Sequence, residues 1–249
     1  MLLHQRFATT CRAPEVASFG GVEASGRVAE KNRMYDELLA VHTVLRRAAA
    51  LTAAAMSRLA TGEPVDVETL VRVAHWQHEF LRRHRRHAEV RFWPVLRDLF
   101  PGVALNSLRT SRTALDAQLS RLVQATDDLE HALMFPAPHR QAAAVGIAAA
   151  LGEPAAARTR DLLIAHLDHE ELTLWEVFPR IPAYTIETLR RAVADLPPRS
   201  APELVLGLLS DPRPAPGAAA VLDHLPAAMR LARPAMVERY EQTKRDLAL

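Results

Sequence analysis

Two stretches of the chain share one pattern, H-x-x-H-[A/E]-E-[V/L]-x-x-W: His84-Arg-Arg-His87-Ala-Glu89-Val-Arg-Phe-Trp93 and His166-Leu-Asp-His169-Glu170-Glu171-Leu-Thr-Leu-Trp175. Side chains four residues apart on an α-helix differ in direction by only about 40°. His166 and Glu170 are therefore expected to share one helix face, whereas the first copy pairs His84 with Ala88 at that spacing. Two such helices facing each other would bring histidines and carboxylates together inside a helical bundle.

The composition favours an all-α protein. Of the 249 residues, 49% are hydrophobic, much of that share is alanine and leucine, and no β-branched run alternates with period 2. The net charge of +2 gives no general reason to expect nucleic acid or a membrane surface as a partner. Cys11 is the only cysteine, so any metal must be held by nitrogen and oxygen ligands.

The hydrophobic periodicity predicts an up-down four-helix bundle with a C-terminal helical extension. Its helices are expected over about 34–59, over 67–99 with Asp66 as N-cap, over 107–134, and from Pro154 to Phe178 after a break at Gly152. Residues 1–30 are expected to form a flexible tail and 31–181 the bundle. Residues 182–249, interrupted by prolines, are expected to be helices packed on it, the last from about Pro234.

The location expected for the protein is the cytoplasm. No stretch reaches the roughly 18 uninterrupted apolar residues of a membrane span. The first residues, MLLHQRF, lack the apolar core of a secretory signal.

Four residues on the predicted apolar stripes are candidate metal ligands. His42 lies among Leu38, Leu39 and Leu45, His84 is central in the stripe of the second helix, and His166 and Glu170 lie in that of the last helix. A buried carboxylate is costly unless it is paired or coordinated, so Glu170 carries most weight. The alternatives are a hydrogen-bonded core histidine and a core glutamate paired with an arginine. The simplest interpretation of the arginines around His84 is that they form a solvent-exposed face of the helix.

With these residues in place, the chain resembles the hemerythrin-like (HHE cation-binding) proteins over about 34–181. The resemblance rests on His42 in Leu-Leu-Ala-Val-His-Thr-Val-Leu-Arg-Arg and on the helix ends Trp93-Pro94 and Phe178-Pro179; the part with Leu225-Pro226 and Tyr240 is similar to tails of actinobacterial members. It implies a four-helix bundle that in its fullest form holds two irons through five histidines and two carboxylates. His42, His84, His166 and Glu170 match ligands of that set.

Two departures from the family pattern reduce the set. Ala88 stands at the carboxylate position of the second helix, with Glu89 one residue later, and no histidine lies between Ser107 and Glu130, where Asp116 is the nearest substitute. The clear ligands suffice for one metal. A pair would need further ligands, the candidates being His87, Glu89, His169 and Asp116.

The resemblance implies a non-haem iron protein, with manganese, zinc or copper as alternatives for the one or two ions. Its partners would be O2, peroxide, NO or a small-molecule substrate. An enzyme of this kind would be an oxidase or oxygenase, with secondary metabolism as one setting for it. The alternative hypothesis is a metal-poor helical sensor or interaction protein that keeps the bundle without redox chemistry. The sequence leaves the oligomeric state open.

Overall fold

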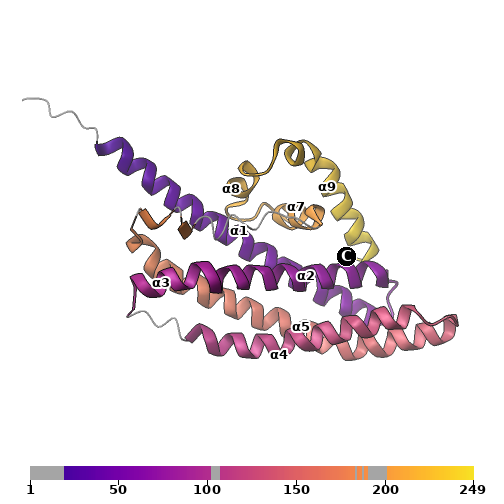
Figure 1. The fold of residues 1–249 in the computed structure, drawn as a ribbon. Coiled ribbons are helices and arrows are strands. Elements are labelled where there is room, and N and C mark those ends of the chain that lie inside the picture. Colours follow the sequence, from indigo (N-terminus) through magenta and orange to yellow (C-terminus); the bar gives the residue numbers. More distant parts are fainter. Residues whose placement is uncertain (1–19, 102–106, 183, 187, 190–200) are drawn as a thin grey trace, which may run out of the picture.

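A computed structural model describes residues 20–101, 107–182, 184–186, 188–189 and 201–249, without the side chains of 20–30 and 107–111. Within these residues every regular element is helical, which confirms the predicted all-α class (Figure 1).

Four long helical segments carry the core. They are α1 (Gly20–Ala60); α2 (Val67–His87), continued by a π-helical turn η1 (Ala88–Phe92) and α3 (Trp93–Leu99); α4 (Ser107–Leu133); and α5 (Pro138–Val177). α1 packs against α2 and α5, and α4 packs against the same two helices. Figure 1 shows the four lying lengthwise along one another. Each segment turns fully buried leucines inward, among them Leu45, Leu81, Leu115 and Leu163.

The ends of α1 and α2 follow local chemistry. Gly62, just beyond α1, has φ +84°, a conformation that glycine adopts without the steric cost of a Cβ. Asp66 then accepts a hydrogen bond from the backbone N–H of Thr69 at 3.1 Å. This confirms Asp66 as the N-cap of α2, where it satisfies one of the unpaired N–H groups of the first turn.

The first helix is longer than expected. α1 begins at Gly20, so the prediction of a tail over 1–30 is wrong for residues 20–30, while residues 1–19 lie outside the described part. Residues 22–31 are mostly alanine, glutamate, valine and arginine, and adding residues to an existing helix is far easier than nucleating one. The three glycines of this segment, Gly20, Gly21 and Gly26, therefore do not prevent helix formation.

The predicted break at Gly152 and Pro154 is also wrong, because α5 runs through both residues. Pro154 removes one helical hydrogen bond, but it lies on the exposed side, where its ring disturbs no packing. Gly152 is buried: a Cβ there would lie 3.0 Å from Cβ of Ala125 in α4 and 3.2 Å from Sδ of Met56 in α1. Close packing against α1 and α4 thus stabilises the helical conformation of α5 around Gly152 and Pro154.

The C-terminal part lies against α1. After the short 3-10 turn η2 (Phe178–Arg180), it contains α7 (Pro202–Ser210), α8 (Ala218–Asp223) and α9 (Ala227–Asp246), which begins before the expected Pro234. α7 packs on α9, and both α7 and α8 contact α1. Arg47 of α1 donates hydrogen bonds to the carbonyl oxygens of Leu208 at 2.6 Å and Arg213 at 2.9 Å. At Gly207 the ring of Tyr240 comes so close that a Cβ would overlap it.

One stretch, Lys31–Ala60, is long and apolar enough to cross a membrane by length and composition, and 67% of its most apolar window is buried inside the fold. This is weak evidence for a span, because the core helix of a soluble protein passes the same test. A cytoplasmic location stays a prediction.

The two glycines of α5 should respond oppositely to substitution. Gly152→Val should lower the free energy of unfolding by about 1–3 kcal/mol, because the added methyl groups must displace Ala125 and Met56. Gly146→Ala should raise it by about 0.5–1 kcal/mol, since Gly146 is exposed, has open space around its Cα and gains helix propensity. Urea unfolding measures both, and equal effects would contradict the close contact at Gly152.

Candidate metal centre

Three helices bring His42, His84 and Glu170 together in the core. His42 comes from α1, His84 from α2 and Glu170 from α5, and their exposed fractions are 0%, 5% and 5%. One ligand atom of each lies within 4.8 Å of those of the other two, a spacing at which one ion could bind all three. The rings of His42 and His84 meet edge to face, with centroids 5.2 Å apart.

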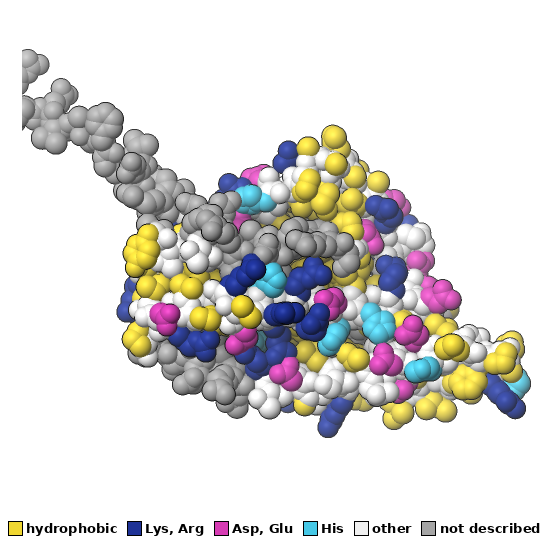
Figure 2. All heavy atoms as spheres, viewed as in Figure 1, with side chains coloured by type: hydrophobic (Ala, Val, Ile, Leu, Met, Phe, Trp, Pro, Cys, Tyr) yellow, Lys and Arg dark blue, Asp and Glu magenta, His cyan; other side chains and the backbone are white. Residues whose placement is uncertain are grey.

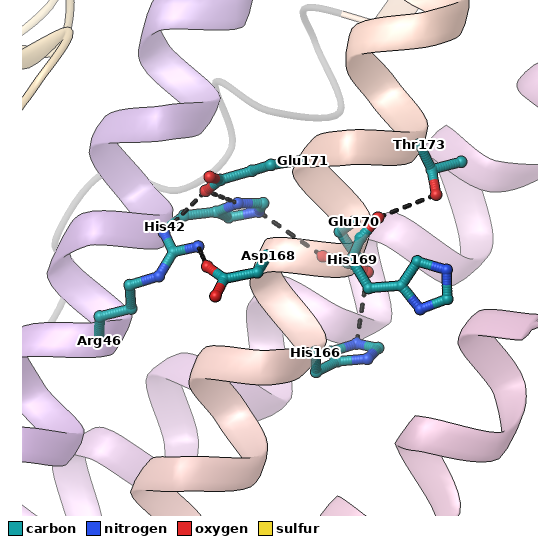
Figure 3. A network of polar contacts seen from close by, with 8 residues as sticks. All are labelled: His42, Arg46, His166, Asp168, His169, Glu170, Glu171 and Thr173. Carbon is teal, nitrogen blue, oxygen red and sulfur yellow. Dashed lines mark hydrogen bonds and ion pairs between the residues drawn. The ribbon is translucent and has the colours of Figure 1, made fainter.

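His166 completes the group one helical turn before Glu170. Its Nε2 lies 3.4 Å from Oε1 of Glu170, and Nε2 of His42 lies 3.6 Å from Oε2 of the same carboxylate. Glu170 therefore lies between two imidazoles, as Figure 3 shows. His166 is thus beside the group of His42, His84 and Glu170 through its contact with Glu170, although it lies outside the set whose ligand atoms are all within 4.8 Å of one another.

The Nε2 atom of His42 is buried and has no hydrogen-bond partner. Buried polar atoms are nearly always paired, so an unpaired imidazole nitrogen facing a carboxylate needs a physical explanation. One explanation is a metal ion to which Nε2 donates this lone pair. Such an ion would lie between Nε2 and the carboxylate of Glu170.

The charge states of His84 and Glu170 are those that a metal requires. Burial, and next the charge of His42, lower the pKa of His84 to about 3, so its ring is neutral at neutral pH. For Glu170 burial alone would raise the pKa, but hydrogen bonding to His166 and the charges of His42 and His166 outweigh it and bring the pKa to about 2. A neutral imidazole and an ionised carboxylate are the forms that ligate metals.

Glu171 lies beside the centre, a position for which it was not among the residues selected from the sequence. Its Oε1 accepts the Nδ1–H of His42 at 2.8 Å and a hydrogen bond from Nη1 of Arg46 at 2.7 Å. Nη2 of Arg46 also donates to Asp168 at 2.6 Å (Figure 3). The available signal was Arg46, four residues after His42 and so close to it on the same face of α1.

Other expected ligands lie elsewhere. Glu89 forms an ion pair with Arg112 of α4, and Asp116 pairs with Arg85. His87 lines a surface pocket with Arg82, Arg83, Arg86 and Arg91. Figure 2 shows basic side chains gathered over α2 on the face that it displays. His169 is half-buried and is absent from the group within 4.8 Å. The π-helical turn begins at Ala88, four residues after His84, and ends the regular α-helical register that would relate later residues to His84.

A second histidine–carboxylate group lies on the surface between α2 and α4. It consists of His75, Asp127 and Glu130, whose ligand atoms are also within 4.8 Å of one another. His75 Nε2 is 3.5 Å from Glu130 and 3.9 Å from Asp127. The three side chains are all well exposed, and mutual ion pairing accounts for their arrangement.

No family model matches the chain, and neither a curated protein nor a solved structure matches it. The resemblance to hemerythrin-like proteins therefore stays a prediction that rests on the residues themselves.

The metal-free protein should lose stability on acidification through His84. Its pKa is about 3 in the fold and 6.5 ordinarily, so between these values the unfolded chain binds a proton that the fold excludes. At about pH 5 this amounts to about 2 kcal/mol of lost stability relative to neutral pH. In His84→Gln the difference between urea midpoints at neutral pH and pH 5 should shrink accordingly.

His139→Gln is the matched control for this measurement, since His139 is exposed. It should keep the wild-type pH dependence. A wild-type pH dependence in His84→Gln as well would mean that His84 is protonated without penalty inside the fold.

Proposed function

We propose that the chain is a hemerythrin-like up-down four-helix bundle that binds one metal ion through His42, His84, His166 and Glu170. The observation that carries the proposal is the convergence of these buried groups from α1, α2 and α5, with Nε2 of His42 left unpaired. The cyclic packing of α1, α2, α4 and α5 supports the bundle. Three imidazoles and one carboxylate suit iron, manganese, zinc or copper, and the family resemblance favours iron.

A single ion fits the donors better than a pair. Opposite Glu89, α4 supplies the guanidinium of Arg112, a cation, and its Asp116 is held by Arg85. Ala88 offers no donor at the position where the second copy of the repeat has Glu170. The four clear ligands would leave room on the ion for a small molecule to bind.

Bound iron would supply redox chemistry toward O2, peroxide or NO, as the family resemblance implies. The chain's own contribution is to exclude water and restrict access, because the four ligating side chains are at most 5% exposed. Only small molecules fit such a closed centre without rearrangement of the helices. An oxidase or oxygenase acting on a larger substrate would need α1, α2 or α5 to move.

The alternative, a helical sensor or interaction protein without a metal, is favoured by one observation. Glu170 already has two imidazoles beside it, so a hydrogen-bonded polar cluster could satisfy the carboxylate without any ion. That cluster does not satisfy Nε2 of His42. Metal analysis of protein purified without chelator separates the two functions.

Glu170→Ala should remove most of the metal, because it deletes the only buried carboxylate of the centre and leaves three neutral donors. Glu89→Ala is the matched control: it also deletes a carboxylate from a repeat copy, but one that pairs with Arg112. Metal per chain, measured by elemental analysis, should be near one in the wild type and in Glu89→Ala. A folded wild-type protein without metal, or equal loss in both variants, would refute the proposal.

A further inference from the structure

We propose that Glu171, anchored by Arg46, is a positioning residue that fixes the ring of His42 with Nε2 directed at the metal. This inference rests on the proposed function, since it assigns a role to a residue that contacts a ligand and not the ion itself.

The hydrogen-bond pattern determines which nitrogen of His42 carries the proton. An ionised carboxylate only accepts hydrogen bonds, so the contact of 2.8 Å between Nδ1 and Glu171 places the hydrogen on Nδ1. In the neutral ring Nε2 then keeps its lone pair, the form that binds a metal. That nitrogen is the buried atom without a hydrogen-bond partner.

Two successive carboxylates of α5 hold the ring from both sides. Glu171 contacts Nδ1 on the outer side, and Glu170 lies 3.6 Å from Nε2 on the inner side. Successive residues on a helix point about 100° apart, so this pair can bracket a ring that enters from α1. The Glu170-Glu171 doublet therefore divides its work between binding and orientation.

Arg46 keeps Glu171 in place. Its two guanidinium nitrogens reach Glu171 and Asp168 at once, a fork that fixes the carboxylate relative to the backbone of both helices. Arg46 and Glu171 lower each other's freedom to rotate while remaining only 22% and 24% exposed. Asp168 is more exposed, at 57%, so the network runs from the surface to the buried centre.

The first copy of the repeat supplies an internal comparison. Glu89, which matches Glu171, also pairs with an arginine of a neighbouring helix, and it is outside the group of His42, His84 and Glu170. Removing either glutamate deletes one cross-helix ion pair, and only the change at Glu171 should disturb a metal ligand. Loss of such an outer partner commonly lowers metal affinity about 10–100-fold.

The test is a titration with Co²⁺, whose visible spectrum reports on the ligands and which binds nitrogen and oxygen sites more tightly than Fe²⁺. Glu171→Leu should bind Co²⁺ about 10–100-fold more weakly than the wild type. Glu171→Gln should lose less, because its amide oxygen can still accept from both His42 and Arg46. Glu89→Leu should bind as the wild type does. If Glu171→Leu fails to fold, Arg46→Gln replaces it in the titration, and this variant should bind Co²⁺ moderately more weakly than the wild type.

Long-range ¹H–¹⁵N spectra of the histidine-labelled, metal-free protein give a second measurement that simple destabilisation would not change. At a pH where the ring is neutral, His42 should carry its proton on Nδ1 in the wild type and lose this preference in Glu171→Leu. A proton on Nε2 in the wild type, or equal Co²⁺ affinity in Glu171→Leu and Glu89→Leu, would overturn the positioning role. Absence of Co²⁺ binding in the folded wild type would instead overturn the proposed function, and the role with it.

Discussion

The buried carboxylate of Glu170 is the group whose requirements shape the interior of the fold. Taking an ionised carboxylate out of water costs several kcal/mol, and no lysine or arginine is recorded within ion-pair distance of it in the described residues. Its compensation comes from His166 on its own helix and His42 on α1, and the charges of these rings keep its pKa low despite burial. α1 and α5 must therefore stay in register to within a fraction of a helical turn.

Arginine–glutamate pairs between helices provide that register at two places. Arg46 of α1 holds Glu171 of α5, and Arg112 of α4 holds Glu89 of α2. These glutamates are equivalent in the two copies of the repeat, so the repeated carboxylate acts across a helix interface in both. The position before it is the one that differs, Ala88 in one copy and Glu170 in the other. The buried acid is thus confined to a single helix.

This asymmetry gives the centre an unequal coordination. α1, α2 and α5 direct donors into the core, whereas α4 contributes apolar side chains such as Leu115 and Leu122 and an arginine that points to Glu89. An ion bound as proposed would therefore take its protein ligands from α1, α2 and α5.

The sequence by itself determined the helical class, the Asp66 N-cap and the burial of His42, His84 and Glu170 in one group, because each depends on local periodicity that survives in the fold. It could not determine the path of α5 through Pro154, since packing against Met56 and Ala125 overrides a local helix-breaking tendency. The start of α1 at Gly20 was missed for a related reason, because an established helix extends through residues of modest propensity.

The role of Glu171 and the pairing of Glu89 with Arg112 depend on which arginine a neighbouring helix places opposite each carboxylate. Only the tertiary structure decides that, because the partners lie far apart in the chain and no spacing rule links them.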